Sequence, residues 1–180
     1  MIEHIIITSL SGAVSASHNP NTEQKVWITA VDPADKSKVL NMKRRFGTAG
    51  IKHFPQFFED IEDHSPDRSH LTEAMIEERG PQMQHINSII SFIEPFVASK
   101  QNYKLGINCY AGLCRSTAIG IVVWVLQGKT PEEALELILK ARPVAWPNQR
   151  VLRLASVRLE KDLTTAVADW KASQLGKLIV

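Results

Sequence analysis

The sequence NCYAGLCRST occupies residues 108–117, between the apolar stretch 105–107 and a longer apolar stretch over residues 118–126. Five uncharged residues separate Cys109 from Arg115. That spacing lets the backbone curl around a tetrahedral anion with its N–H groups pointing inward. Such a concave loop needs a residue free of Cβ crowding, and Gly112 supplies it. The stretch therefore predicts a phosphate-binding loop between a strand and a helix.

Each polar residue of this loop has a predicted role. The planar guanidinium of Arg115 can hold two phosphate oxygens at once, and the start of the following helix adds partial positive charge. Cys109 would lie below the phosphorus, where N–H donors and Arg115 favour its thiolate form, and Ser116 could donate a hydrogen bond to it. We expect the substrate phosphate to be bound by the whole loop: Tyr110, Ala111, Gly112, Leu113, Cys114, Arg115 and Ser116.

The loop resembles the signature of the cysteine-dependent protein tyrosine phosphatase superfamily, in which His-Cys, five residues, Arg and Ser or Thr form the catalytic loop. Ala111-Gly112 matches the compact, dual-specificity-like branch. The resemblance covers residues 54–154 and is closest to small bacterial phosphatases, through the motifs at residues 58–61 (FEDI) and 141–148 (ARPVAWPN). It implies that Cys109 is the nucleophile and Arg115 the transition-state clamp. Asn108 stands where the family has a histidine that helps to order the loop and tune the thiolate.

The resemblance also implies a general acid. In the family, an aspartate on a mobile loop after the strand preceding the long helix protonates the leaving oxygen, and the same group can later activate water. Asp60 fits that position, with Asp63 and Asp67 as rivals. The chain between Asp60 and Cys109 is longer than in compact family members, which implies an enlarged connection over residues 61–81.

Composition and charge are consistent with one catalytic domain over residues 1–180. The formal charge of +2 and the absence of a basic stripe argue against nucleic acid or an anionic membrane as partners. The N-terminal apolar run is too short for a secretory signal, and the run 118–126 is too short for a membrane span. Both cysteines lie inside the loop, so we expect no structural disulfide and a cytoplasmic location. No oligomeric state is predicted.

Strand and helix signals alternate along the chain. Residues 5–10, 25–31, 53–61 and 105–108 have the composition of strands, and helices are expected over residues 86–97, 116–127 and 130–141, with a last helix from about 148 past 163. This order predicts an α/β fold in which a central, mostly parallel sheet is flanked by helices, in the three-layer architecture of dual-specificity phosphatases. The loop would then leave the carboxyl end of a strand, where such sheets bind ligands.

Several residues have two readings. Cys114 is either a packing residue or a redox partner of Cys109, and Asn148 is either the N-cap of the last helix or a side chain that steadies the loop. The run 43–45 (KRR) reads as a solvated helical face, with a secondary phosphate site as the alternative. The four tryptophans read as core or interface residues. The six histidines show no paired ligand spacing, so no metal site is expected.

The sequence therefore predicts a protein tyrosine or dual-specificity phosphatase that acts on a phosphorylated protein or a small phosphoester without a cofactor. A phosphoinositide or nucleotide phosphatase is the enzymatic alternative, although the loop has no lysine for extra phosphates. A phosphate-binding module without turnover is the non-enzymatic alternative, and Asn108 is the residue that favours it. A sulfurtransferase fits less well, because its cysteine loop is usually shorter.

Overall fold

A computed structural model describes residues 1–19, 21–62 and 71–177. Its centre is a four-stranded sheet made of β1 (Ile2–Thr8), β2 (Val26–Val31), β3 (Lys52–Phe57) and β4 (Tyr103–Asn108). The strands lie in the order β1-β4-β2-β3, and every neighbouring pair is parallel. The predicted mostly parallel sheet is thus confirmed. The carboxyl ends of all four strands lie at one edge, where Thr8 and Thr29 are both paired with Asn108.

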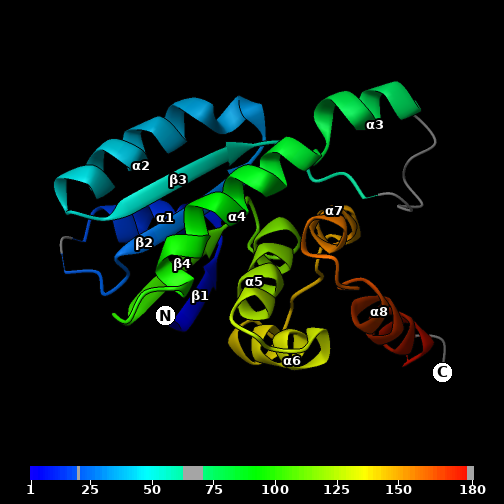
Figure 1. Ribbon diagram of the computed structural model, residues 1–180. Coiled ribbons are helices and arrows are strands. Elements are labelled where there is room, and N and C mark those ends of the chain that lie inside the picture. The colour runs from blue at the N-terminus through cyan, green and yellow to red at the C-terminus, as the bar shows by residue number, and fades with distance from the viewer. Residues whose placement is uncertain (20, 63–70, 178–180) are drawn as a thin grey trace.

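Helices connect and cover these strands (Figure 1). They are α1 (Leu10–Ser17), the short 3₁₀ helix η1 (Pro33–Asp35), α2 (Lys36–Thr48), α3 (Glu73–Arg79), α4 (Met83–Val97), α5 (Arg115–Leu126), α6 (Pro131–Ala141), α7 (Gln149–Leu159) and α8 (Thr165–Lys177). None of the described helices is both long and apolar enough to cross a membrane.

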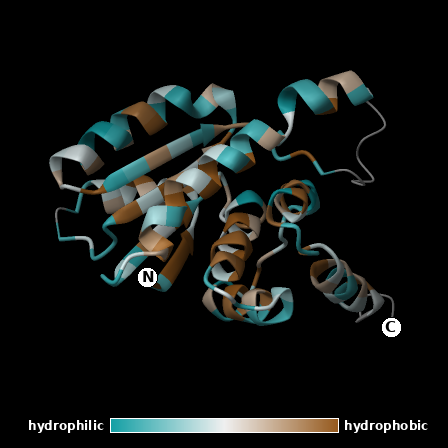
Figure 2. Ribbon diagram, viewed as in Figure 1, coloured by the Kyte–Doolittle hydropathy of each residue, from teal (hydrophilic) through white to brown (hydrophobic). Residues whose placement is uncertain are grey.

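The side chains of β2 show that helices cover both faces of the sheet. Val26, Ile28 and Ala30 belong to the large core formed with α4, α5, α6 and α7. Trp27 and Val31 point to the opposite face, because successive residues of a strand alternate, and there they pack against residues of α1 and α2. The apolar colouring of α5 in Figure 2 follows this burial. The predicted three-layer architecture is confirmed.

The sequence missed or misjudged several elements. The expected strand 5–10 ends at Thr8, because Ser9 caps α1 by accepting a hydrogen bond from the N–H of Gly12. The expected strand 53–61 ends at Phe57. Neither α1 nor α3 was expected. The helix expected over residues 86–97 is α4, which begins earlier, at Met83, and continues through Pro95 to Val97.

The single last helix predicted from residue 148 past 163 is wrong. The chain forms two helices, because Glu160 adopts a left-handed backbone conformation with φ of 53° and ends α7. Asp162 then accepts hydrogen bonds from the backbone N–H groups of Thr164 and Thr165, at 2.8 and 3.2 Å, which starts α8. The extra helix brings the C-terminal part of the chain back against α6.

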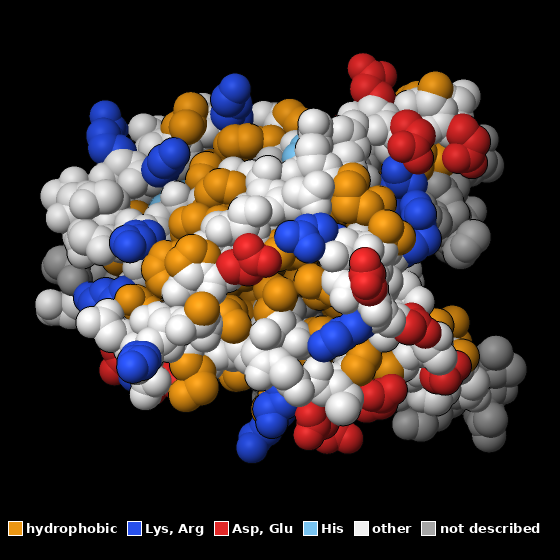
Figure 3. All heavy atoms as spheres, in the orientation of Figure 1, with side chains coloured by type: hydrophobic (Ala, Val, Ile, Leu, Met, Phe, Trp, Pro, Cys, Tyr) orange, Lys and Arg blue, Asp and Glu red, His pale blue; other side chains and the backbone are white. Residues whose placement is uncertain are grey.

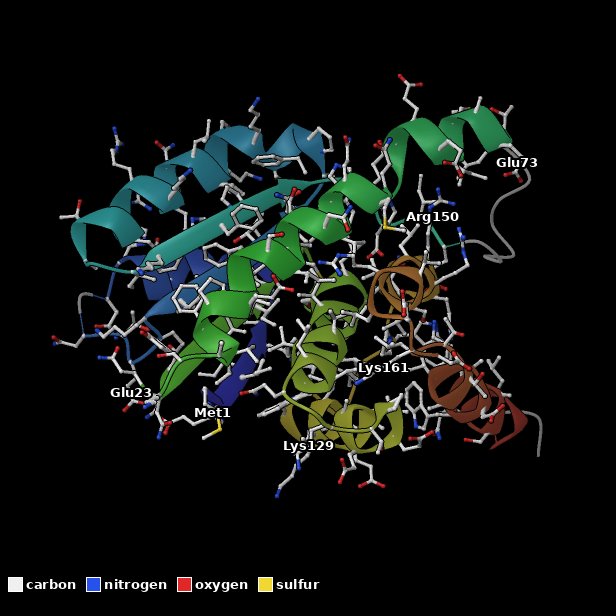
Figure 4. The ribbon with its side chains drawn as sticks, viewed as in Figure 1. Met1, Glu23, Glu73, Lys129, Arg150 and Lys161 are labelled. Atoms are coloured by element: carbon white, nitrogen blue, oxygen red, sulfur yellow. The ribbon has the colours of Figure 1, made fainter. Side chains whose placement is uncertain are left out.

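Helix α7 is fixed to the region of α3 by a buried arginine. In Figure 4, Arg150 lies at the start of α7, below α3. Its Nε donates to the carbonyl of Pro81 at 2.9 Å, and its Nη2 donates to Glu77 Oε1 at 2.8 Å. The enlarged connection predicted over residues 61–81 therefore contains a helix, and that helix is attached to the body of the fold.

Candidate active site

The loop 109–115 leaves β4 and enters α5 at the carboxyl edge of the sheet. Gly112 has a φ of +73°, a conformation that side chains other than glycine rarely adopt. A Cβ at this position would also lie 2.6 Å from the carbonyl carbon of Thr8. The loop therefore needs glycine here for two reasons, its backbone conformation and its close approach to the end of β1.

The carbonyl groups of the loop are bound by neighbouring segments on its outside. Backbone N–H groups donate to three of them, and the side chain of Arg142 donates to two more. The pairs are Leu10 N with Tyr110 O (3.0 Å), Trp146 N with Leu113 O (2.9 Å), Asn148 N with Cys114 O (3.2 Å), Arg142 Nε with Gly112 O (3.2 Å) and Arg142 Nη2 with Ala111 O (3.4 Å). Since these carbonyls face outward, the loop has the polarity of an anion-binding nest.

The Cys109 thiol lies at the bottom of this loop and is 1% exposed. The backbone N–H of Gly112 donates to its sulfur at 3.2 Å, and Ser116 Oγ lies 3.2 Å away on the first turn of α5. The expected contact between Ser116 and the sulfur is therefore present. A sulfur surrounded by donors at a helix N-terminus is suited to carry negative charge.

Arg115 is buried, at 2% exposure, and is held at one end of its guanidinium. Its Nη1 donates to Asp32 Oδ1 at 3.0 Å and to the carbonyl of Phe58 at 2.6 Å. Its Nε is buried and has no hydrogen-bond partner within the described part of the chain. A buried cationic donor that makes no hydrogen bond is costly unless a ligand satisfies it, so this edge of Arg115 is suited to an anion.

Asp32 was missed by the sequence analysis. It follows β2 directly, so its place at the same sheet edge as the loop could have drawn attention to it. What could not be read from the sequence is that β2 lies next to β4. That pairing brings Asp32 to Arg115.

Asp60 lies beside Arg115 in the segment after β3. Its Oδ2 is 3.5 Å from Arg115 Nε, and its Oδ1 accepts a hydrogen bond from Asn148 Nδ2 at 2.8 Å. The side chain is 31% exposed, which leaves one edge open to solvent. The structure thus brings Asp60 together with the loop. Its rivals Asp63 and Asp67 lie outside the described residues.

Asn148 combines the two roles that the sequence left as alternatives. Its Oδ1 accepts from the N–H of Val151 at 3.0 Å and so caps α7. Its Nδ2 donates to Asp60 and, at 3.2 Å, to the carbonyl of Ile61, while its backbone N–H donates to Cys114 O. One buried residue therefore links α7, the Asp60 segment and the loop.

Asn108, which replaces the family's histidine, is fully buried and is bound by side chains of β2. Its Oδ1 accepts from Trp27 Nε1 at 2.8 Å and from Thr29 Oγ1 at 2.7 Å. Thr29 uses its only proton in this bond, so it must accept from His53 Nε2, 2.8 Å away. Burial lowers the pKa of His53 to about 3, so the ring is neutral at neutral pH and has its one proton on Nε2. The network fixes the end of β4, although Asn108 Nδ2 makes only a long contact of 3.5 Å with Cys109 O.

The second loop cysteine has a different environment. Burial, followed by the nearby negative charge of Asp60, raises the pKa of Cys114 to about 12. Its thiol is therefore protonated at neutral pH. The KRR run at residues 43–45 is exposed on α2, as expected of a solvated face. Basic side chains are scattered over the face in Figure 3 and form no stripe there.

Three of the solved structures that share this fold are Tk-PTP, human DUSP28 and PTPMT1. Tk-PTP in its active form is 16% identical, with 86% of this chain and 90% of that chain covered and a TM-score of 0.55. Human DUSP28 is 14% identical, with 85% and 86% covered and a TM-score of 0.55. PTPMT1 is 15% identical, with 94% and 95% covered and a TM-score of 0.56, and it has also been solved in complex with PI(5)P.

Sequence comparison finds no matching family model and no matching curated protein. The likeness to solved structures thus concerns the fold. The chain has the fold of the cysteine-dependent protein tyrosine phosphatase superfamily, which its loop sequence predicted. Its assignment to the bacterial branch stays a prediction.

Proposed function

We propose that this protein is a cysteine-dependent phosphomonoester hydrolase of the tyrosine or dual-specificity type. The observation that carries the proposal is the polarity of the loop 109–115. Its carbonyls are bound on the outside, while its functional face contains a thiol and the buried Nε of Arg115, which makes no hydrogen bond within the described residues and only a 3.5 Å ion pair with Asp60. This is the arrangement that a phosphoryl group in transfer requires, because its charge spreads over three equatorial oxygens.

In the first half-reaction, the Cys109 thiolate attacks phosphorus and an S–P bond forms as the ester O–P bond breaks. The leaving oxygen takes a proton from the Asp60 carboxyl, which lies beside Arg115 and is 31% exposed. Arg115 holds the equatorial oxygens through Nε and Nη2 while Asp32 and the Phe58 carbonyl hold Nη1. The product alcohol or phenol leaves, and the phosphoryl group stays on Cys109.

In the second half-reaction, water attacks phosphorus and the S–P bond breaks, which returns the thiolate. Asp60 is now ionised and accepts the proton of the attacking water, so one aspartate serves both steps. Asn148 Nδ2, 2.8 Å from Asp60 Oδ1, orients the carboxyl in both protonation states. Ser116, 3.2 Å from the sulfur, stabilises the thiolate as it leaves. In this mechanism Cys109, Asp60 and Arg115 supply the nucleophile, the proton donor and acceptor, and the phosphate-binding charge, so no cofactor is invoked.

The surroundings of the loop favour a phosphorylated protein, and above all phosphotyrosine, as the substrate. A cavity of about 530 Å³ lies beside the loop and is lined by Leu10, Ser11, Val14, Ser15, Lys38 and Tyr110. Its largely apolar wall, with Tyr110 60% exposed, suits an aryl leaving group. The loop itself offers no lysine for a second phosphate, and Lys38 is paired with Asp35 at 2.9 Å.

Two alternatives have specific support. PTPMT1, which shares the fold, has been solved with PI(5)P, and this favours a phosphoinositide as the second substrate class. A nucleotide would use the same chemistry. A binding module without turnover is favoured only by Asn108. The hydrogen bonds among Asn108, Trp27, Thr29 and His53 argue against it, because they order the start of the loop as the family's histidine would.

We further propose that the protein is cytoplasmic and that its partners are its substrates, a phosphorylated protein or a small phosphoester. The proposal rests on the requirement for a reduced nucleophile: both cysteines are free, and a reducing compartment keeps Cys109 active.

Turnover of a panel of esters tests the proposed function. The panel contains phosphotyrosine and phosphoserine peptides, phosphoinositides, nucleotides and an activated aryl phosphate. We expect hydrolysis with the phosphotyrosine peptide as the best natural ester, and inhibition by vanadate, which mimics the five-coordinate phosphorus. Faster hydrolysis of the phosphoinositide than of the phosphotyrosine peptide would make the protein a phosphoinositide phosphatase instead. Binding of phosphate esters without any turnover would replace the enzyme by the binding module.

A further inference from the structure

A lysine of the C-terminal helix contacts the segment that carries Asp60. Lys171, on α8, is only 8% exposed. Its Nζ lies 3.0 Å from Glu62 Oε1 and 3.3 Å from Oε2, so it binds both carboxylate oxygens. Glu62 is two residues beyond Asp60 and its side chain is 22% exposed. An ion pair this sheltered is screened far less than one on the surface.

Glu62 has a second partner that fixes its direction. The backbone N–H of Gln149, the first residue of α7, donates to Glu62 Oε1 at 3.2 Å. The carboxylate therefore bridges the N-terminus of α7 and the ammonium of α8, and an anion at a helix N-terminus is favoured. Asn148, the residue before Gln149, holds Asp60 itself. Asp60 and Glu62 are thus attached to the same turn of the chain.

Lys171 also contacts the loop indirectly. Its Nζ lies 4.9 Å from the centre of the Trp146 ring, which packs against Trp170 with ring centres 5.6 Å apart. The N–H of Trp146 donates to the carbonyl of Leu113 in the loop. The start of α8 is fixed to the core by Leu163, two residues before the helix, and by Val167 in its first turn, both of which are fully buried. A single lysine therefore joins α8 to both parts of the candidate active site.

We propose that Lys171 is a positioning residue for the general acid, a role that rests on the proposed function. By binding Glu62, it keeps the segment that carries Asp60 against Asn148 and Arg115. The C-terminal helix is then part of the catalytic machinery, although none of its side chains contacts the reacting atoms. Removing the ammonium leaves the Glu62 carboxylate half-buried and held by a single N–H, and a buried carboxylate that loses its cation moves toward solvent. Asp60 would move with it.

The test compares Lys171→Met and Glu62→Gln with the control Lys161→Met. Lys161 is an exposed lysine in the turn between α7 and α8 (Figure 4), and methionine keeps the length of either lysine. We measure kcat/KM, which reports the steps up to release of the leaving group and so isolates the first half-reaction. The two substrates are a phosphotyrosine peptide, whose leaving group needs a proton, and an activated aryl phosphate, whose leaving group does not. In both Lys171→Met and Glu62→Gln we expect kcat/KM to fall roughly tenfold for the peptide and to change little for the aryl phosphate, because only proton transfer to the leaving group is misplaced. Lys171→Arg should retain most of the activity.

The same substitution on the Asp60→Asn background separates positioning from general loss of structure. If Lys171 acts through Asp60, Lys171→Met lowers kcat/KM for the peptide no further once Asp60 is gone. Equal losses on both esters, a loss that persists in the Asp60→Asn background, or no loss at all would each overturn the proposal.

Amide hydrogen exchange at residues 59–62 keeps this inference apart from the proposed function. We expect faster exchange there in Lys171→Met than in Lys161→Met. A wild-type protein that hydrolyses no ester would sink the proposed function, and the exchange rates would then decide alone whether Lys171 orders this segment. Unchanged exchange in an active enzyme would refute the role of Lys171.

Discussion

The loop 109–115 and the segment 58–62 face each other across Arg115, yet they are held in different ways. Three carbonyls of the loop are bound by backbone donors and two by the side chain of Arg142, and Gly112 fixes the backbone conformation. The segment is anchored by the buried side chains of Phe58 and Ile61. Its polar side chains are held by side chains far away in the sequence: Glu59 by Arg79, Asp60 by Asn148 and Glu62 by Lys171. Backbone contacts survive most substitutions, whereas side-chain contacts can be removed one at a time. The phosphate-binding half of the site should therefore be robust and the proton-transfer half sensitive.

The largest expected effect comes from the chemistry of the loop itself. Cys109→Ser should abolish turnover but keep binding of a phosphate ester, because the backbone nest and Arg115 remain. Arg115→Lys should weaken both by roughly a hundredfold, since an ammonium cannot replace a bidentate guanidinium. Steady-state kinetics and calorimetric binding of a phosphotyrosine peptide measure the two effects. Undiminished turnover in Cys109→Ser would remove the nucleophile from the mechanism.

The second largest effect should come from Asp60, in the proton-transfer half of the site. Asp60→Asn should lower kcat/KM for esters with poor leaving groups by roughly a hundredfold and that for activated aryl esters much less, because only the former need a proton on the leaving oxygen. The asparagine can still accept from Asn148, so the local structure should be retained. Finding this pattern in Asp63→Asn instead would transfer the acid role three residues along the chain and leave the loop unchanged.

A glycine pair tests how far the loop depends on its backbone. Gly112→Ala combines a left-handed conformation with a Cβ 2.6 Å from the carbonyl carbon of Thr8. Gly128→Ala has a φ of +90° but no atom within 4 Å of the new Cβ. Gly128→Ala should lower the free energy of unfolding by about 1 kcal/mol from strain, and Gly112→Ala should lower it by more, because the backbone at the end of β1 must also shift. Only Gly112→Ala should also lose turnover, by roughly tenfold, because the loop must move away from β1. Equal turnover in the two variants would contradict the close approach.

The smallest effect concerns the second cysteine. Mild peroxide should give a Cys109–Cys114 disulfide in peptide mass mapping, with activity restored by dithiothreitol, and Cys114→Ser should lose this recovery. Because the pKa of Cys114 is raised to about 12, its thiolate is scarce at neutral pH and grows as the pH rises toward that value. Disulfide formation should therefore quicken with pH. Full recovery of Cys114→Ser would leave Cys114 as a packing residue.

The sequence predicted the loop well because its determinants are local. Cys109, Gly112, Arg115 and Ser116 are close in the chain, and their order alone specifies a strand, a nest and a helix. Asp60 was also reachable, since it follows a strand that ends at the same sheet edge. The helix expected over residues 130–141 is α6, and its N-cap Thr130 forms a capping box with Glu133.

What the sequence missed depends on long-range packing. Asp32 and Lys171 reach the site only because β2 lies beside β4 and because the chain turns back after Glu160. Both facts arise from tertiary contacts, and a residue with a left-handed backbone that is not glycine gives no warning in the sequence. Asn108 was recognised as a departure, but its partners Trp27, Thr29 and His53 come from two other strands.

The most direct test of the central claim is to trap the phosphoryl group on Cys109. Asp60→Asn is mixed with an activated aryl phosphate, quenched in acid within a turnover and mapped by peptide mass spectrometry. The first half-reaction needs no acid with this ester, while the second lacks its base, so the cysteinyl phosphate should accumulate. We predict a phosphoryl group on the peptide containing Cys109 and none when Cys109→Ser is added to the same protein. Product release with no labelled cysteine, or with the label on another residue, would contradict the account.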